Sequence, residues 1–223
     1  MAGWVIGAGL GLSLGLLVGG VGGPALRPLF GFGVVLAAFH TLEFAMTAVF
    51  HPNSLSFDSS LLNHSREYLL AHICAVVEFL IETCLVEVPW RRAPIRGVLA
   101  LAGLGVCLVG QAFRTLAMWE AGRNFTHVIA TVKDDKHVLV TSGVYALVRH
   151  PSYLGFFLWA VGAQILLANP ICAAAFVVCL WKYFAQRVVY EEHLLVRFFG
   201  DGYERYRTRV RRTGIPFVRP APY

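Results

Sequence analysis

Long runs of apolar residues separated by short polar connections dominate the hydrophobic pattern of this chain. Most of these runs approach the roughly 20 residues that an α-helix needs to cross the hydrocarbon core of a bilayer. The pattern therefore predicts an all-α integral membrane protein with about six transmembrane segments. The expected segments are Ala2–Gly23, Leu29–Val49, Tyr68–Val88, Val98–Ala117, Tyr153–Asn169 and Pro170–Gln186.

The last two segments are expected to form a tight helical hairpin. Residues 153–181 are an uncharged run of 29 residues with Asn169-Pro170 near its middle, whereas two complete spans need about 40 residues. The second arm must therefore continue as a helix past Lys182. That continuation places Arg187 and Glu191 one turn apart on the same helical face.

Two further features of the pattern predict local structure. Glycines at every fourth position of the first segment predict a flat groove for close helix packing. They do not indicate a nucleotide site, because no strand precedes them. The stripe consists of Gly7, Gly11, Gly15, Gly19 and Gly23. Near the C-terminal end, a short basic helix, Tyr203–Arg212, is expected after the break at residues 200–202.

Composition and charge agree with a membrane location. With 57% hydrophobic and 14% charged residues, the chain is unlike a soluble globular domain. If both termini are cytosolic, 15 of the 19 Lys and Arg residues lie on the cytosolic side, in the sense of the positive-inside rule. The other four are Arg27, Arg91, Arg92 and Arg96, and the Arg91-Arg92 pair fits this orientation least well.

The net charge of +6 is concentrated in the C-terminal tail, which favours contact with anionic lipid headgroups. Nucleic-acid binding explains these charges less well, because they flank membrane spans. All five cysteines lie in apolar segments and form no C-x-x-C pair. They are typical of small buried hydrophobic residues, so neither a metal site nor a disulfide framework is expected.

The polar chemistry gathers after the fourth segment. A connector from Gly122 to Lys136 is longer than packed helices need, and long connectors of this kind are usually functional. Pro151 restricts His150 to an extended conformation and suits the first position of a helix. A helix N-terminus flanked by Arg149 and His150 is a suitable site for a carboxylate.

Three stretches in this region resemble the isoprenylcysteine carboxyl methyltransferase family: R-H-P-S-Y-L-G at 149–155, H-V-L-V-T-S-G-V-Y at 137–145, and Glu191-Glu192. The resemblance is dense from about Asn124 to Pro216 and thinner before it. It implies an integral membrane enzyme of the endoplasmic reticulum. Such an enzyme transfers a methyl group from S-adenosylmethionine to the C-terminal carboxylate of prenylated proteins, with farnesyl or geranylgeranyl cysteine as the acceptor.

The resemblance also assigns roles to individual residues. Glu191 would bind the ammonium group of the cofactor, and Arg187 would be the catalytic residue, orienting the substrate carboxylate. Glu192 points about 100° away on the helix and is expected to be structural. Ala130 departs from family members that have Gln there. The expected cofactor-binding residues are His137, Val138, Leu139, Val140, Tyr145, His150, Pro151, Ser152, Tyr153 and Glu191.

The expected architecture is a single membrane domain, residues 1–223. Residues 1–118 would give the lipid substrate access, and residues 119–223 would form the catalytic region. The cofactor pocket, built from the 119–151 connector and the C-terminal helix, would face the cytosol. The sequons at Asn63 and Asn124 would then lie in the cytosol and carry no glycan.

Other functions stay open at this point. Integral membrane sterol reductases, which use NADPH, carry a similar R-H-P-x-Y segment, and a phospholipid N-methyltransferase needs the same cofactor end. A non-catalytic helical scaffold or transporter predicts no cofactor binding. Ionisable residues within spans are candidates for function, but interhelical hydrogen bonding is favoured for His40, Glu43, Glu78 and Glu82.

Overall fold

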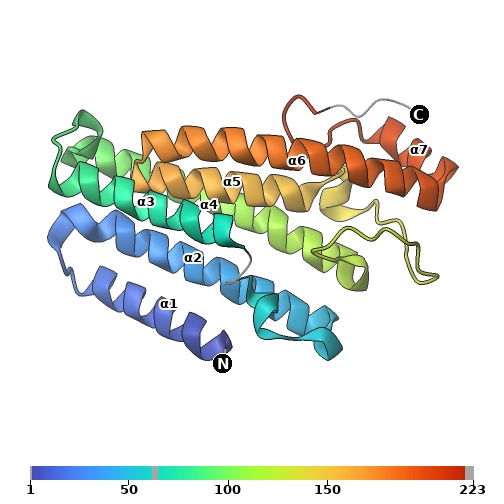
Figure 1. Ribbon diagram of the computed structural model, residues 1–223, viewed down its shortest axis with the longest axis horizontal. Coiled ribbons are helices and arrows are strands. Elements are labelled where there is room, and N and C mark those ends of the chain that lie inside the picture. Colours follow the sequence, from blue (N-terminus) through green and yellow to red (C-terminus); the bar gives the residue numbers. More distant parts are fainter. Residues whose placement is uncertain (1, 62–64, 219–223) are drawn as a thin grey trace. The chain divides into compact units, whose positions relative to one another are not determined.

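The computed structural model describes residues 2–61 and 65–218, and the regular structure within them is entirely helical (Figure 1). The expectation of an all-α protein is therefore confirmed. Short 3-10 turns connect some of the helices. The helices are α1 (Ala2–Val18), α2 (Gly23–Phe50), α3 (Arg66–Cys84), α4 (Ala93–Ala121), α5 (Pro151–Leu167), α6 (Pro170–Phe199) and α7 (Asp201–Arg209).

The chain forms two compact units, and helices α4, α5 and α6 contribute to both. Unit 1 contains Met1–Val109 and Leu158–Phe176. Unit 2 contains Gly110–Phe157 and Val177–Tyr223. The expected division at residue 118, between a part that gives the lipid substrate access and a catalytic part, stays a prediction.

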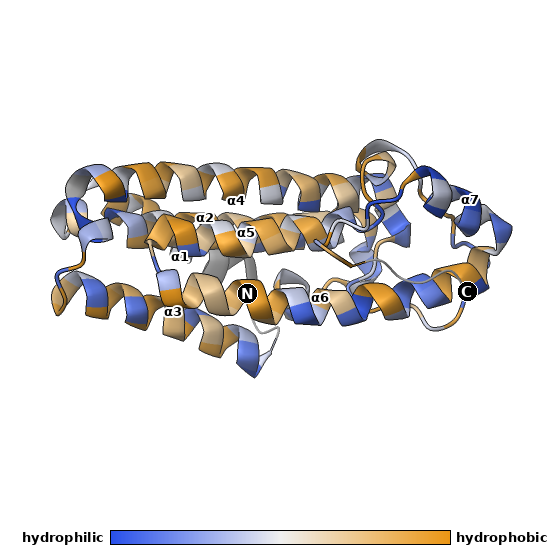
Figure 2. Cartoon of the chain, turned by 90° about the horizontal axis from the view of Figure 1, so that it is seen from above, coloured by the Kyte–Doolittle hydropathy of each residue, from blue (hydrophilic) through white to orange (hydrophobic). Residues whose placement is uncertain are grey.

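Within the residues that the structure describes, three helices are long and apolar enough to cross a bilayer: α2, α4 with the turn that follows it, and α6. Helix α5 and the apolar part of α1, Gly7–Val18, are shorter. Hydrophobic residues colour most of α4 and α5, whereas α7 is largely hydrophilic (Figure 2). The protein is therefore an integral membrane protein, and the number of six spans stays a prediction.

The hairpin expected at Asn169-Pro170 is confirmed. Helix α5 ends at Leu167, Ala168 adopts a left-handed conformation with φ 55°, and α6 begins at Pro170. Proline suits the first position of a helix, where no amide hydrogen is needed. Helix α6 then continues for 30 residues, or about 45 Å, so the expected continuation past Lys182 is also confirmed.

Glycine allows close helix packing in this protein, but on other helices than the sequence predicts. A Cβ atom on Gly7, Gly11 or Gly15 would meet no described atom within 4 Å, so the packing groove expected on α1 is wrong within the described chain. In unit 1, a Cβ on Gly103 of α4 would lie 2.2 Å from the backbone nitrogen of Leu166 in α5. Packing requires contact between two surfaces, and a repeat in one helix does not identify its partner.

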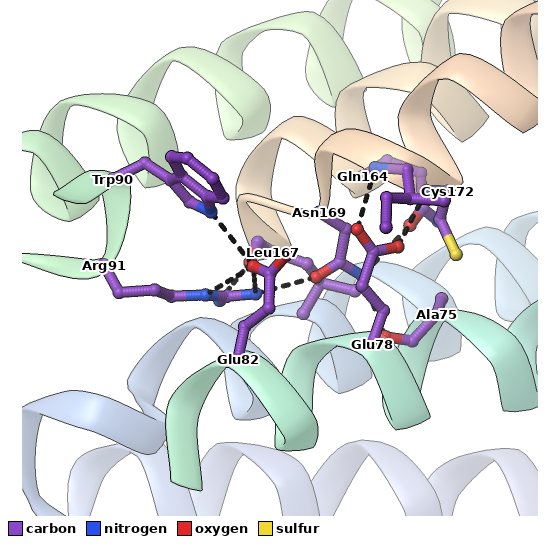
Figure 3. Close-up of polar contacts among 10 residues, drawn as sticks. Ala75, Glu78, Glu82, Trp90, Arg91, Gln164, Leu167, Asn169 and Cys172 are labelled. Atoms are coloured by element: carbon purple, nitrogen blue, oxygen red, sulfur yellow. Dashed lines mark hydrogen bonds and ion pairs between the residues drawn. The ribbon is translucent and has the colours of Figure 1, made fainter. Parts of the chain in front are cut away.

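A polar cluster in unit 1 holds the hairpin turn against α3 and the short turn Pro89–Arg91 that precedes α4 (Figure 3). The Arg91 guanidinium donates to Glu82 Oε2 at 3.1 Å and to Asn169 Oδ1 at 2.9 Å. It also donates to the Leu167 carbonyl oxygen at 2.5 Å, and the Trp90 indole donates to Glu82 Oε2 at 3.0 Å. Arg91, which fitted the expected orientation poorly, is thus paired with a carboxylate.

A second carboxylate caps α6. The two oxygens of Glu78 accept from the backbone amides of Ile171 at 2.8 Å and Cys172 at 2.7 Å. These are among the amides that a helix N-terminus leaves without an intrahelical partner, and an anion there is stabilised by the helix dipole. Interhelical bonding, as expected, is confirmed for Glu78, whereas Glu82 binds Trp90 and Arg91 of the connection between α3 and α4. Interhelical bonding is also confirmed for His40, whose Nε2 lies 3.2 Å from the Tyr68 hydroxyl.

Candidate active site

The R-H-P segment in unit 2 is held by the C-terminal tail. The backbone amides of Arg149 and His150 donate to the carbonyl oxygens of Arg212 at 2.9 Å and Thr213 at 2.8 Å. Gly214, with φ 107°, passes so close that a Cβ there would lie 3.1 Å from the His150 carbonyl oxygen. This pairing explains why α7 ends at Arg209 and not at Arg212 as expected, because the chain becomes extended to reach His150.

Glu192 lies beneath this segment and is fully buried. Its Oε1 accepts from Arg149 Nε at 2.6 Å and lies 3.1 Å from His150 Nε2. The Arg149 guanidinium also donates to the Val210 carbonyl oxygen at 2.6 Å. The structural role expected for Glu192 is confirmed. The positive charge of Arg149 is already compensated by this carboxylate, which weakens its expected contribution to an anion site.

Tyr153 joins Arg187, which is expected to bind the acceptor, to Glu191, which is expected to bind the cofactor. Its hydroxyl donates to Glu191 Oε2 at 2.5 Å and accepts from Arg187 Nε at 2.8 Å. The ring is stacked between His150, at 5.5 Å, and Phe184, at 5.0 Å between ring centroids. The hydroxyl is therefore fixed in place, and Arg187 and Glu191 are joined through it.

Arg187 is also bound to the connector and to its own helix. Its two terminal nitrogens donate to the Tyr183 hydroxyl at 3.2 Å and to the His127 carbonyl oxygen at 2.6 Å. A guanidinium has five N–H groups. The contacts with Tyr183 and His127, together with the contact with Tyr153, use three of them. One N–H on each terminal nitrogen is left over among the contacts of the described residues.

The expected cofactor-binding residues at His137–Val140 and Tyr145 belong to a segment that packs against the C-terminal tail. Leu139 and Tyr145 contact the buried side chains of Tyr203, Tyr206 and Val210. The Tyr206 hydroxyl donates to the Tyr145 carbonyl oxygen at 2.7 Å. Burial raises the pKa of Tyr206 to about 12 and raises the pKa of Tyr145 and of Tyr203 as well, so these phenols stay protonated near neutrality.

Asn124 connects the two ends of the polar connector. Its side-chain oxygen accepts from the Val138 amide at 2.9 Å, and its side-chain nitrogen donates to the Ala121 carbonyl oxygen at 3.3 Å. The backbone amide of Val138, one of the expected cofactor-binding residues, is thus bonded within the chain. Val138 itself is exposed.

Ser152 reveals a residue that the sequence reasoning missed. Its hydroxyl accepts from the buried Arg114 of α4 at 2.6 Å, and the Arg114 guanidinium lies 5.5 Å from the Phe125 ring centroid. The signal was present, because Arg114 is the only charged residue from 97 to 119 and ionisable residues in apolar helices are candidates for function. The structure thus brings Arg187, Glu191, Tyr153 and His150 into one contact network, whereas Ser152 bonds to Arg114 and Pro151 begins α5.

These features define a class of protein: a helical integral membrane protein whose polar site is built from the end of a membrane helix, a long connector and a C-terminal tail. The sequence profile of the isoprenylcysteine carboxyl methyltransferase (ICMT) family matches residues 102–197. The chain belongs to this family.

Its relatives and a solved structure agree with that assignment. The chain is 43% identical to the protein-S-isoprenylcysteine O-methyltransferase of Xenopus laevis over 86% of this chain and 65% of that protein. For the Tribolium castaneum enzyme of the same name, the identity is 42% over 94% and 73% of the two chains. A structure described as the eukaryotic intramembrane Ras methyltransferase ICMT superposes with a TM-score of 0.87 at 39% identity, covering 98% of this chain and 76% of that one. The chain thus spans slightly less than two thirds of the length of some curated relatives.

Proposed function

We propose that this protein transfers a methyl group from S-adenosylmethionine to the C-terminal carboxylate of an S-prenylated cysteine, giving the methyl ester. The arrangement that carries the proposal is the contact Glu191–Tyr153–Arg187, in which one phenol joins an anionic and a cationic side chain. Such a pair of charges fits two substrates whose reacting ends are oppositely charged.

Arg187 is the residue for the acceptor. Its two unused N–H groups, one on each terminal nitrogen, match the two oxygens of a carboxylate, and bidentate pairing of this kind fixes the orientation of the acceptor. The contacts with Tyr153, Tyr183 and His127 hold the guanidinium in place, so little of its freedom is lost on binding. The pose of the acceptor is thereby determined before the reaction.

Glu191 is the residue for the cofactor. Its side chain is 27% exposed, which leaves room for a carboxylate oxygen to accept from an ammonium group in addition to Tyr153. His150 and Ser152 lie at the start of α5 and complete this end of the site. When bound, S-adenosylmethionine supplies a methyl group that its sulfonium already activates, so these residues need only bind and orient it.

The reaction requires no general base. A C-terminal carboxylate is ionised near neutrality and can attack as it stands, so alignment and exclusion of water are the contributions of the protein. A phenol is already protonated near neutrality, and burial raises the pKa of Tyr206 and of Tyr145 further, so neither hydroxyl acts as a base there. The rate is therefore expected to show no titration of a protein base near neutral pH.

The proposed setting is the endoplasmic reticulum membrane, with the site facing the cytosol and the prenyl chain entering from the bilayer past the helices of residues 1–118. In this orientation the sequons at Asn63 and Asn124 carry no glycan. Asn63 lies outside the described residues, whereas the Asn124 side-chain nitrogen donates to the Ala121 carbonyl oxygen. An endoglycosidase-sensitive mass shift at either sequon would invert the topology.

The direct test combines binding and turnover. Purified protein in lipid nanodiscs is titrated with S-adenosylhomocysteine by calorimetry, and methyl transfer to N-acetyl-S-farnesylcysteine is followed with radiolabelled S-adenosylmethionine. We expect saturable binding and a base-labile labelled ester. Absence of S-adenosylhomocysteine binding would favour a scaffold, and binding of NADPH in its place would favour a reductase. Labelling of phospholipid without labelling of the prenylcysteine would favour an N-methyltransferase.

A further inference from the structure

The end of the chain, within unit 2, returns along α6 and places one aromatic side chain in an unusual position. The Trp181 indole nitrogen of α6 donates to the Pro216 carbonyl oxygen at 2.8 Å. Trp181 lies 18 residues before the end of α6 at Phe199, a distance of about 27 Å along the helix. Residues 210–218, here named the C-terminal strap, therefore extend well back from the end of α6.

The strap ends in a tight turn that is fixed on both sides. The Val218 amide donates to the Ile215 carbonyl oxygen at 3.3 Å, and the buried Thr213 hydroxyl lies 3.1 and 3.0 Å from the carbonyl oxygens of Ile215 and Val218. Ile215 and Val218 are buried against Phe184 and Val188. The residues between them, Pro216 and Phe217, occupy the two central positions of the turn.

Phe217 is a poor choice for this turn if the turn serves folding alone. Its φ of 62° is left-handed, and glycine is the usual residue where the second central position of a turn needs a positive φ. The ring is 94% exposed, so no packing within the described chain offsets the strain. A bulky residue that stays at a positive φ despite this backbone strain indicates that its side chain has a role other than stabilising the fold.

The position of the turn along α6 indicates its partner. Trp181 is the last residue of the uncharged run from 153 to 181, and Lys182 is the first charge after it. The membrane segment expected for this arm ends at Gln186, five residues or about 8 Å further along the helix, and tryptophan is enriched near this end of a span, where the hydrocarbon core meets the headgroups. Its bond to Pro216 fixes Phe217 at the same level.

The charges near the turn agree with a lipid partner. Arg209, Arg211 and Arg212 are exposed, and residues 209–218 contain no acidic side chain. Basic residues at a membrane surface attract anionic headgroups. An aromatic residue and several arginines within one short segment are the combination that interfacial segments use.

We propose that the Pro216–Phe217 turn is a membrane-interface anchor whose partner is the phospholipid bilayer. Through it, lipid stabilises the C-terminal strap, whose residues Arg212 and Thr213 accept the backbone bonds of Arg149 and His150. The candidate active site is thus supported at one edge by the bilayer. The anchor depends on no property of the cofactor or the acceptor.

The first experiment locates residue 217. Phe217→Trp and the control Thr208→Trp, at an exposed position of α7, are placed in nanodiscs of phosphatidylcholine with or without bromine near the headgroup end of the acyl chains. After subtraction of the parent signal, we expect the emission from position 217 to be quenched by brominated lipid and that from position 208 to be unaffected. Equal quenching at both positions, or none at 217, overturns the proposal. So does emission at 217 that responds to N-acetyl-S-farnesylcysteine but not to brominated lipid, because the turn would then contact substrate.

The second experiment separates anchoring from strain by the sign of the effect. Cleavage by trypsin after Arg212 in nanodiscs reports how often the strap opens. Phe217→Gly removes the strain, so a turn without a partner should open less often and be cut more slowly. A turn anchored by its ring should instead be cut about 5–10-fold faster in Phe217→Gly, as expected from loss of most of a buried Phe, and Phe217→Leu should restore slow cleavage. Slower cleavage of Phe217→Gly contradicts the anchor, while the proposed methyl transfer stands or falls on its own assays.

Discussion

Two clusters of charged and polar side chains, one in each unit, differ in how completely their hydrogen-bonding groups are used. In unit 1, Arg91 donates to Glu82, to Asn169 and to the Leu167 carbonyl oxygen (Figure 3). The Trp90 indole donates to Glu82, and the Asn169 side chain donates to the Ala75 carbonyl oxygen. In unit 2, Arg187 is held by three contacts and still has an N–H on each terminal nitrogen.

The difference separates a structural cluster from a binding site. Buried polar groups must be paired, and in unit 1 the contacts of the described residues use four of the five Arg91 N–H groups, so little of this cluster is left for a ligand. A cluster that holds its side chains in place but leaves donors and a partly exposed carboxylate can bind a second molecule. Sequence types alone do not separate them, since both contain an arginine and glutamates on apolar helices.

The largest expected effect is on the stability of unit 1. Arg91→Ala leaves Glu82 and Asn169 without their partner, and breaking a buried ion pair costs about 3–5 kcal/mol. We expect a strong fall in the thermal unfolding midpoint in nanodiscs, measured with a thiol-reactive dye or by loss of helix signal. The exposed neighbour offers a matched control, since Arg92→Ala should change the midpoint little. An unchanged midpoint for Arg91→Ala would show that the cluster in unit 1 is not structural.

The next effect is on catalysis and not on stability. Arg187→Lys keeps the charge but loses the planar fork, so methyl transfer in single turnovers should fall about 100-fold, equal to about 2.7 kcal/mol. The dissociation constant of S-adenosylhomocysteine should stay within about threefold, because Glu191 keeps its bond with Tyr153. Arg205→Lys, at an exposed position, is the control. Normal turnover would remove the orienting role, and a parallel loss of cofactor binding would favour a structural pairing with Glu191.

At the cofactor end, Glu191→Gln keeps the shape of the side chain and removes its charge. Affinity for S-adenosylhomocysteine should fall roughly 10–100-fold, or about 1.4–2.8 kcal/mol. His150→Ala should also weaken cofactor binding with the fold retained. Calorimetric titration of both variants gives the answer, and affinities like that of the parent would show that the cofactor binds elsewhere.

The smallest effect is a loss of stability in alkali. Because burial raises the pKa of Tyr206 to about 12, the folded protein holds this proton more tightly than the unfolded chain, whose pKa is near 10. The stabilisation is fully present below about pH 10 and is lost as the pH rises through about 12. Tyr206→Phe should lower the unfolding midpoint at pH 8, since the bond to the Tyr145 carbonyl is absent, and should make the decline between pH 10 and 12 shallower. A decline of equal slope in both proteins would assign it to other groups.

Local sequence accounts for much of the fold because its causes are local. The length of the uncharged runs predicts membrane helices, Asn169-Pro170 marks a turn, and Pro151 marks a helix start. The one-turn spacing of Arg187 and Glu191 follows from helix geometry, and both residues do meet Tyr153 in the structure. Boundaries were less certain: α3 ends at Cys84, four residues before the expected end, and α2 begins at Gly23, six residues early.

By itself, then, the sequence determined the helical membrane class, the hairpin and the short list of residues with reactive or charged groups, because these depend on composition and on neighbours along one helix. Tertiary structure alone decided which groups remain available. Arg149 is paired with Glu192 and Ser152 with Arg114, contacts across 43 and 38 residues of chain, whereas Arg187 keeps two N–H groups. The physical reason is that hydrogen-bond satisfaction depends on partners brought together from distant segments, and no local pattern specifies which partners those will be.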